Sequence, residues 1–185
     1  MGWKCFWVAA VQTVHDSEVP CMKQQTVIAI SGVKNSGKTT LIQRILPKLT
    51  AEGLNVAVIK HDGHTFQADP VDTDTGKYME AGAYGTAIFD GEKYKIIKCS
   101  TIDEQDLIQQ FPEADVILLE GLKYSIWPKI EIIRAENSAQ PVCSSDTLLA
   151  LVTDVPNIQI NVPILDVNEI DGVVKVILQY RNTKM

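Results

Sequence analysis

The chain has 185 residues, of which 45% are hydrophobic and 22% are charged, a composition that suits one compact globular domain. Its 17 Lys and Arg residues against 23 Asp and Glu residues give a formal net charge of −6, so bulk electrostatics offers no attraction to nucleic acid or anionic lipid. The four cysteines form no CxxC pair, so neither a disulfide framework nor a zinc ribbon can be inferred from them. We therefore expect a cytoplasmic protein with no nucleic-acid and no membrane partner.

The first 25 residues stand apart from the rest of the sequence. They carry aromatic residues without clear periodicity, and Met22 shortly precedes the first patterned segment. We predict an N-terminal extension over residues 1–25, either upstream of a start at Met22 or packed on the domain as a short strand or helix. Residues 26–185 are predicted to form a single domain, because no long linker or repeat interrupts them.

From residue 26 onward, short apolar runs alternate with glycine-containing turns and helix-like stretches. β-branched runs that are apolar almost throughout are typical of strands that a parallel sheet buries on both faces. Strands are predicted over residues 26–31, 56–59, 116–119, 129–134 and 148–152.

Between several of the predicted strands, apolar residues recur at the spacing of a helix. Helices are predicted from Leu41 to near Gly53, over residues 77–83 and 102–111, and from Asn168 or Asp171 to Tyr180. An Asp-Gly pair at 90–91, between two β-rich runs at 84–89 and 93–98, predicts a β-hairpin. The chain is thus predicted to have an α/β fold, with a mostly parallel sheet flanked by helices and an antiparallel hairpin as an extension.

One motif indicates the chemistry of this fold. Residues 32–39, Gly-Val-Lys-Asn-Ser-Gly-Lys-Thr, match the phosphate-binding loop (P-loop) G-x-x-x-x-G-K-[ST] and lie between a predicted strand and an amphipathic helix, the context that the motif requires. Backbone N–H groups and the helix N-terminus attract phosphate, the lysine reaches the β- and γ-phosphates, and the threonine hydroxyl coordinates Mg²⁺. We predict a nucleotide site with Lys38 as a catalytic residue. Its predicted binding residues are Gly32, Asn35, Ser36, Gly37, Lys38, Thr39 and Thr40.

A nucleotide site of this kind also needs a carboxylate for the metal ion or for its water. Asp115 and Glu120 lie at opposite ends of one predicted strand. Ligands of open α/β sheets bind at the carboxyl ends of the strands, so Glu120 faces the site and Asp115 does not. Glu120 is therefore predicted to be a catalytic and metal-binding carboxylate, with Thr39 as a metal ligand beside it.

The polar segment 60–76 follows another predicted strand and begins at the same edge of the sheet. Three interpretations remain open. One is a switch segment, in which a lysine meets phosphate and an aspartate holds the water shell of the metal ion. Another is half of a transition-metal site built from two histidines, and the third is a solvated loop. The residues concerned are Lys60, His61, Asp62, His64, Asp69 and Asp74.

Together with the P-loop, four further segments form an ordered set that resembles the molybdopterin-guanine dinucleotide biosynthesis protein B family. The set comprises GVKNSGKTT at 32–40, VIKHDGH at 58–64, Asp74-Thr75 followed by AGA at 81–83, LLEGLK at 118–123 and PKIEIIR at 128–134. The resemblance extends from about residue 26 to residue 134 and, more faintly, through 154–156 and 162–163. The first 25 residues lie outside it.

This resemblance implies a GTP-binding, usually homodimeric protein with weak Mg²⁺-dependent hydrolysis, which assists the molybdenum cofactor guanylyltransferase. Molybdopterin or its guanine dinucleotide is a further candidate ligand. Carried over residue by residue, the family pattern assigns to the nucleotide site Lys60, His61, Asp62, Asp74 and Glu120, with Asp62 in a catalytic role and Asp62 and Asp74 at the metal. The candidates for cofactor or partner contact are Lys123, Lys129 and Arg134. The alternative for these three residues is that they are strand-end charges in solvent.

The sequence departs from the family pattern in two places. Asp72 stands where the family's Asp-x-x-Gly-x-Asp stretch has a glycine, and an extra carboxylate near phosphates repels them unless a metal ion offsets it. There is also no Asn-Lys-x-Asp guanine motif. Asp154, at the end of a predicted strand, is the candidate to accept hydrogen bonds from guanine N1 and N2, and the preference for guanine rests on the resemblance.

Two other functions remain alternatives. A P-loop small-molecule kinase closes an arginine-rich lid over phosphates, whereas this chain has three scattered arginines, Arg44, Arg134 and Arg181. A GTP-switched adaptor that delivers a metal would order the segment 60–76 around the γ-phosphate. For the dimer, the predicted strand 129–134 is a candidate for pairing across a two-fold axis.

Overall fold

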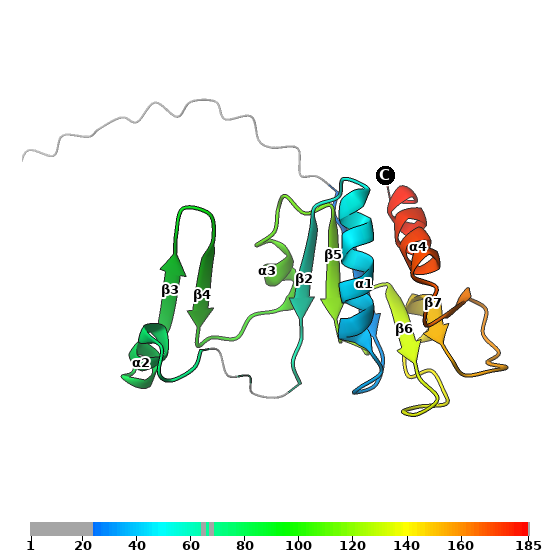
Figure 1. The fold of residues 1–185 in the computed structure, drawn as a ribbon, viewed down its shortest axis with the longest axis horizontal. Coiled ribbons are helices and arrows are strands. Elements are labelled where there is room, and N and C mark those ends of the chain that lie inside the picture. The colour runs from blue at the N-terminus through cyan, green and yellow to red at the C-terminus, as the bar shows by residue number, and fades with distance from the viewer. Residues whose placement is uncertain (1–23, 64–65, 67–68, 185) are drawn as a thin grey trace, which may run out of the picture.

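The computed structural model describes residues 24–63, 66 and 69–184. Its main body is a parallel sheet of six strands in the order β2-β5-β1-β6-β7-β8 (Figure 1). The predicted α/β class with a mostly parallel sheet is confirmed. The strands are β1 (Thr26–Ser31), β2 (Val56–Lys60), β5 (Val116–Glu120), β6 (Lys129–Ile133), β7 (Leu148–Thr153) and β8 (Ile164–Asp166).

The register of the central strands brings their carboxyl ends to one edge of the sheet. β5 lies between β1 and β2, with Glu120 opposite Ile30 on one side and Lys60 on the other. β6 continues the sheet on the other side of β1, with Glu131 opposite Ser31. Every residue of β5 and β6 is buried. Burial on both faces explains why β5 is apolar up to Glu120, whereas β6 buries two charged residues, Lys129 and Glu131, that alternate with isoleucines.

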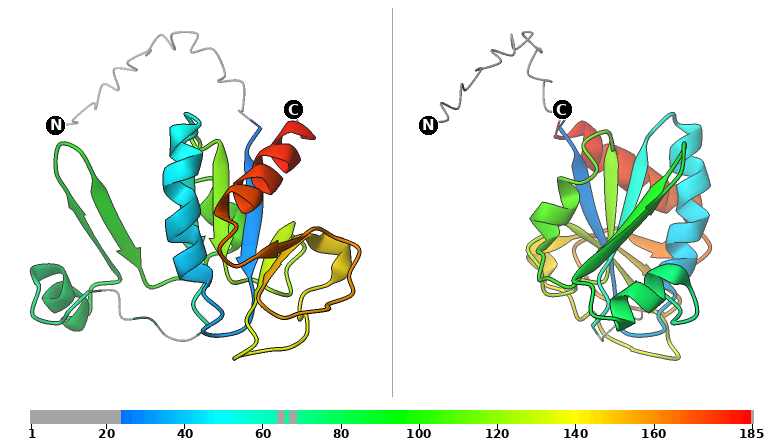
Figure 2. Two further views of the ribbon diagram at one scale, coloured as in Figure 1. Left: turned by 45° about the vertical axis from the view of Figure 1, so that its right-hand side comes forward. Right: turned by 90° about the vertical axis from the view of Figure 1, so that its left-hand side faces the viewer.

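Helices cover the two faces of the sheet unequally (Figure 2). The long helices α1 (Lys38–Ala51) and α4 (Ile170–Asn182) pack on one face over a large apolar cluster that includes Ile28, Ile30 and Leu118. A salt bridge joins the two helices, since Lys48 contacts Asp171 at 2.6 Å. Arg44 of α1 donates to the carbonyl oxygen of Val167, in the loop before α4, at 3.3 Å. The short helix α3 (Glu104–Ile108) and the loop around Trp127 cover a smaller cluster on the other face.

A second, smaller unit lies beyond the β2 edge of the sheet (Figure 1). It consists of the helix α2 (Asp74–Glu80) and the antiparallel hairpin of β3 (Gly85–Phe89) and β4 (Tyr94–Lys98), which confirms the predicted hairpin extension. Asp90 closes the turn, because its Oδ1 accepts from the backbone N–H groups of Glu92 at 2.8 Å and Lys93 at 3.0 Å. These two hydrogen bonds lower the pKa of Asp90.

Several expected elements differ from the structure. The helix expected over 77–83 begins instead at Asp74, because Thr73 caps it by accepting from the N–H of Gly76 at 3.1 Å. The helix expected over 102–111 is limited to the five residues of α3. The strand β8 and the 3₁₀ turn η1 (Ser145–Thr147) were not predicted.

Two further expectations concern the ends and edges of the chain. The predicted pairing of strand 129–134 across a two-fold axis is wrong, because β6 is an interior strand with β1 and β7 on its two sides. The predicted extension over residues 1–25, including the alternative start at Met22, lies outside the described residues except for Gln24 and Gln25. Within the described ranges, no helix has the length and apolarity needed to cross a bilayer.

Candidate functional site

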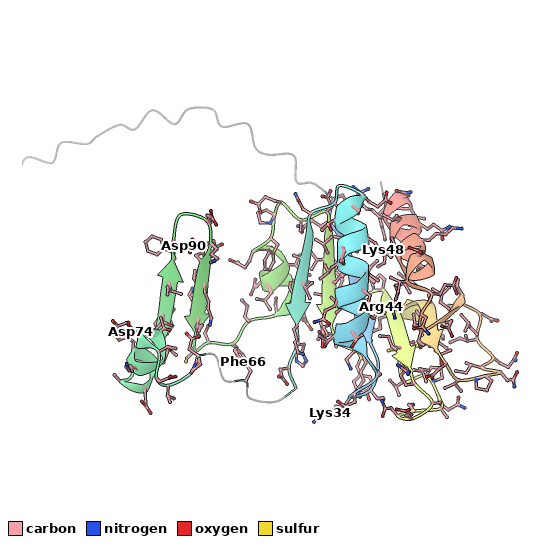
Figure 3. All side chains as sticks on the ribbon, in the orientation of Figure 1. Lys34, Arg44, Lys48, Phe66, Asp74 and Asp90 are labelled. Atoms are coloured by element: carbon pink, nitrogen blue, oxygen red, sulfur yellow. The ribbon has the colours of Figure 1, made fainter. Side chains whose placement is uncertain are left out.

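A polar cavity of about 1180 Å³ opens at the carboxyl edge of the sheet. The P-loop, the ends of β2 and β5, and the loop that follows β5 form its walls. Lys34, in the P-loop, lies just below the N-terminal end of α1 in Figure 3. Because the motif residues and the strand ends come together here, the predicted position of the nucleotide site at the carboxyl edge coincides with a real cavity.

The backbone of the P-loop requires two of its glycines. At Gly32 a Cβ atom would lie 2.4 Å from the carbonyl oxygen of Ile132, so a side chain does not fit there. Gly37 adopts φ 93°, a left-handed conformation that L-residues with side chains rarely adopt. Gly37 is also the N-cap of α1, which has no side-chain cap and no acidic residue in its first turn. The N–H groups of this turn are therefore available to an anion.

Lys38 lies against the P-loop at the start of α1. Its Nζ donates to the carbonyl oxygens of Val33 at 2.7 Å and Gly32 at 3.2 Å. Burial is the main cause that lowers the pKa of Lys38; the nearby charge of Glu120 opposes this, while those of Lys60 and Lys123 lower the pKa further. Three lysine charges and one carboxylate charge thus meet near Lys38, and the excess positive charge suits a polyanionic ligand such as a nucleoside triphosphate.

Glu120 joins the P-loop helix to the neighbouring strand. Its Oε1 accepts from Thr39 Oγ1 at 2.8 Å and from Lys60 Nζ at 3.1 Å, and the residue is 7% exposed. A hydroxyl and a carboxylate oxygen side by side at the cavity wall are hard ligands of the kind that Mg²⁺ prefers, with open space for water and phosphate oxygens. The donor set therefore fits Mg²⁺. Asp115, at the far end of β5, accepts from Asn55 N at 2.9 Å instead.

Most of the predicted site residues line this cavity. Those that the structure brings together are Gly32, Asn35, Gly37, Lys38, Thr39, Thr40, Lys60, His61, Asp62, Glu120 and Lys123. Ser36 does not line it, because its side chain is buried behind the loop with 1% of the residue exposed. Within the described part of the chain, the Ser36 Oγ has no hydrogen-bond partner.

Two predicted residues lie elsewhere. Asp74 opens α2, is 87% exposed and contacts Lys77 at 3.9 Å, and Figure 3 shows it on the hairpin unit, away from Lys34. Its predicted place at the metal is not supported, because the chain carries α2 beyond the β2 edge of the sheet. Asp154 lies at the end of β7, where it accepts from Ala135 N and Arg134 Nε at 2.7 Å each. These two contacts lower the pKa of Asp154.

Asp69, a further acidic candidate of segment 60–76, is not among the residues that line the cavity. Asp69 accepts from Thr75 Oγ1 at 2.8 Å and from Lys95, both in the hairpin unit. His64 lies outside the described residues, so the two-histidine interpretation stays a prediction. Across the described ranges, no group of three or more His, Cys, Asp or Glu residues is arranged to hold a metal ion on its own.

The structure also brings residues to the cavity that were not predicted. They are Lys34, Gly63, Glu104, Gly121, Leu122, Tyr124 and Ser125. Gly121 to Ser125 directly follow Glu120, so their position after a buried strand was the signal that could have identified them. Glu104, at the start of α3, had no such signal. Asn137 supports the P-loop from the other side, since its Nδ2 donates to the carbonyl oxygen of Asn35 at 2.6 Å.

Behind the cavity, under the P-loop strand, lies a cluster of buried polar groups. Lys129 was predicted to contact a cofactor or partner, but it is 0% exposed, so that prediction is wrong. Glu131 is 1% exposed and accepts from the N–H groups of Val142 at 2.8 Å and Cys143 at 3.2 Å. Burial first, and then the charge of Glu131, raises the pKa of Cys143 to about 12.

A parallel sheet whose strand β1 leads through this loop into α1, with a carboxylate at the end of the neighbouring strand, defines the fold of the P-loop nucleoside triphosphatases. Comparison with known proteins identifies the family within that class. The sequence profile described as molybdopterin guanine dinucleotide synthesis protein B (MobB) matches residues 27–154. The chain belongs to this family, which confirms the resemblance seen in its motifs.

Several relatives and solved structures that resemble this chain belong to the same family. The chain is 33% identical over 153 residues to the molybdopterin-guanine dinucleotide biosynthesis adapter protein of Haemophilus influenzae, covering 80% of this chain and 84% of that protein. It is 28% identical over 163 residues to the adapter protein of Escherichia coli, covering 83% and 92%. The crystal structure of Bacillus subtilis MobB matches with a TM-score of 0.68 at 30% identity, covering 83% of this chain and 96% of that one.

The raised pKa of Cys143 predicts how this thiol reacts. A pKa of about 12 in place of 9.0 leaves about a thousandfold less thiolate at pH 8, and the thiolate is the nucleophile. We expect iodoacetamide at pH 8 to label the exposed Cys99 and to spare Cys143, and the rate at Cys143 to keep rising as the pH approaches 12. Peptide mass spectrometry measures both sites. Equal rates at Cys143 in native and guanidinium-unfolded protein would contradict the prediction.

Proposed function

We propose that this chain is a GTP-binding accessory protein of molybdopterin guanine dinucleotide biosynthesis, which hydrolyses GTP slowly with Mg²⁺. The observation that carries the proposal is the convergence of Lys38, Thr39 and Glu120 on a cavity with excess positive charge. The family to which the chain belongs supports the pathway. We further propose that residues 26–185 act as one nucleotide-binding domain and that the protein works in the cytoplasm.

The proposed roles follow from the positions of the residues around the cavity. The N–H groups of the P-loop and first turn of α1 hold the phosphates, and Lys38, Lys60 and Lys123 neutralise their charge. Thr39 and Glu120 would hold Mg²⁺, which would neutralise part of the phosphate charge. Asp62 and His61, at the end of β2, orient water at the γ-phosphate side of the cavity.

The positions of the three arginines support the proposal that hydrolysis is slow. None of the three is among the residues that line the described cavity. Arg44 contacts the loop before α4, Arg134 contacts Asp154, and Arg181 contacts Asp115. Phosphoryl transfer that is fast depends on an arginine or equivalent cation at the transition state. We therefore propose that a partner stimulates hydrolysis, and the same observation argues against a kinase with an arginine-rich lid.

Guanine recognition is proposed at the ends of β6 and β7, on the other side of the P-loop from β5. Each carboxylate oxygen of Asp154 accepts one hydrogen bond from Arg134 or Ala135, which leaves acceptor capacity on both oxygens for guanine N1 and N2. Asn137, in the loop after β6, already contacts the P-loop at Asn35. We therefore propose that the base lies on this side of the P-loop, beyond the residues that line the described cavity.

Two kinds of protein partner are proposed. The relatives in Haemophilus influenzae and Escherichia coli are named adapter proteins of this pathway. Their names support the molybdenum cofactor guanylyltransferase as the partner, with molybdopterin or its guanine dinucleotide as a shared ligand. A second copy of the chain is the other partner. One face of the hairpin supports it, because Ala87, Phe89, Tyr94 and Ile96 form an exposed apolar surface, with Phe89 82% and Tyr94 73% exposed.

Calorimetric titration with GTP and with ATP, each with Mg²⁺, tests nucleotide binding. We expect GTP to bind more tightly than ATP, and Lys38→Ala to weaken GTP binding about 100-fold, because a charge-assisted contact to phosphate is lost in a partly buried site. Lys175→Ala removes an equal charge from the exposed face of α4 and should bind GTP as the unaltered chain does. Preferential ATP binding would favour the kinase alternative.

The role of Glu120 can be separated from that of Lys38. Glu120→Gln keeps the size of the side chain but removes its charge. We expect the Mg²⁺ concentration that gives half-maximal hydrolysis to rise about 10- to 100-fold, while GTP binding without Mg²⁺ persists. Phosphate release against Mg²⁺ concentration measures this. Asp115→Asn, at the other end of β5, should lower stability and leave the Mg²⁺ dependence unchanged. The same Mg²⁺ curve for Glu120→Gln and the unaltered chain would refute the assignment.

Sedimentation equilibrium tests whether a second copy of the chain binds at the apolar hairpin face. We expect the unaltered chain to sediment as a dimer and the double variant Phe89→Asp/Tyr94→Asp to sediment as a monomer, because charges on the apolar hairpin face cannot be buried unpaired. Ile164→Asp, on the exposed β8 edge at the other side of the sheet, is the matched control and should remain dimeric. A dimer that survives in the hairpin variant would show that another surface mediates association.

A further inference from the structure

Lys129 is a completely buried lysine at the start of β6. Its neighbour in register is Ala29, which faces the smaller apolar cluster on the α3 side of the sheet. Its Nζ donates to three neutral oxygens: the carbonyl oxygen of Ser125 at 2.5 Å, the carbonyl oxygen of Trp127 at 2.6 Å, and Ser125 Oγ at 3.3 Å. All three belong to the loop that connects β5 to β6.

An ammonium group in this position is costly. Burial lowers the pKa of Lys129, because an apolar environment disfavours the charged form. An ammonium carries three donors and no acceptor, and here one loop supplies three acceptors to it. An apolar side chain of similar length would fill the same volume without that cost. The presence of a lysine at position 129 is therefore explained by the hydrogen bonds with which it holds the loop 121–128.

This loop forms one wall of the cavity and is held at both ends. Gly121 to Ser125 line the cavity. At the start of the loop, Ser31 Oγ donates to the carbonyl oxygen of Gly121 at 2.5 Å, and at its end stands the Lys129 ammonium. Between these anchors Leu122 adopts φ 50°, a left-handed conformation that costs a non-glycine residue energy and persists only where the surroundings fix it.

The residue that this held loop presents to the cavity is Lys123. Lys123 lines the cavity and lies close enough to Lys38 for its charge to act on it. Its Nζ also lies 5.0 Å from the ring centroid of Tyr124, which is a further contact within the loop. The position of Lys123 at the phosphates therefore depends on the backbone of a loop that the P-loop strand and β6 support from below.

We propose that Lys129 is a positioning residue of the nucleotide site: its buried ammonium fixes the loop 121–128 so that Lys123 reaches the nucleotide phosphates. Lys129 itself touches no nucleotide, and Ser31 serves as the second anchor of the same loop. This inference rests on the proposed GTP binding and adds to it the residues that preorganise one wall of the site.

A double-mutant cycle with Lys123 tests the proposal, with GTP·Mg²⁺ affinity as the readout. We expect Lys129→Met to weaken binding about tenfold when Lys123 is present, and about twofold or less in the Lys123→Met background. If Lys129 acts through Lys123, the two losses do not add. Additive losses, or affinity in Lys129→Met equal to that of the unaltered chain, would overturn the proposal.

Two further variants separate positioning from stability. Ile130→Val lowers the stability of the same strand without touching the loop and should retain full GTP affinity. Ser31→Ala removes only the hydroxyl that holds Gly121, and it keeps the test open if Lys129→Met does not fold. It should show the same non-additive behaviour with Lys123→Met, and additive behaviour would overturn the role of the loop anchors.

Trp127 provides an independent measurement, because its carbonyl oxygen is one of the three acceptors of Lys129. In a Trp3→Phe/Trp7→Phe background it is the only tryptophan of the chain. We expect Lys129→Met to shift its emission to longer wavelength before nucleotide is added, and Lys123→Met to leave it unchanged. Unchanged emission in Lys129→Met would count against the anchor. Absence of GTP binding by the unaltered chain would overturn the proposed function as well, which distinguishes the two failures.

Discussion

The charge balance around Glu120 is the constraint on which the site depends. One carboxylate oxygen joins three elements, because Oε1 accepts from Thr39 of α1 and Lys60 of β2 while Glu120 ends β5. Lys38 and Lys123 add two further positive charges that this carboxylate cannot neutralise alone. In a partly buried site such like charges repel strongly. A polyanion that enters the cavity relieves this repulsion, so the electrostatics selects the class of ligand before any contact with a base is made.

The two faces of the sheet perform different tasks. On the α1 and α4 side the packing is apolar, and it holds the P-loop helix against β1. On the α3 side, the side chains of Ser31, Lys129 and Glu131 are polar and buried, and each bonds to the backbone of a loop rather than to another element of regular structure. Buried polar groups specify geometry because each unmet hydrogen bond is costly. The buried polar groups on the α3 side therefore fix loops, while the larger apolar cluster lies on the α1 and α4 side.

Local sequence signals predicted the parts of this structure that local forces determine. The P-loop, the β-branched strands and the turn at Asp90 depend on residues close in sequence, and the rule that ligands bind at strand carboxyl ends brought Glu120 and Lys60 to the same site. β8 was missed because three residues show no period, and its pairing with β7 is what makes it a strand. Lys129 resembled a solvated strand-end charge, since its burial depends on a loop that returns over it. Asp74 belongs to the segment that follows β2, which ends at the cavity, but the chain carries it away with α2.

In the hairpin unit, residues close in sequence determine the turn but do not bury its apolar face. Its turn chemistry is complete within the chain, because Asp90 satisfies the N–H groups of Glu92 and Lys93. Its packing is not, since the cross-strand pair Phe89 and Tyr94 remains exposed on a sheet of only two strands. A two-stranded sheet is marginally stable in water without something to cover it. The stability of this unit therefore depends on a surface outside it, whereas the candidate site is formed by the strands of the main sheet, their loops and the helices α1 and α3.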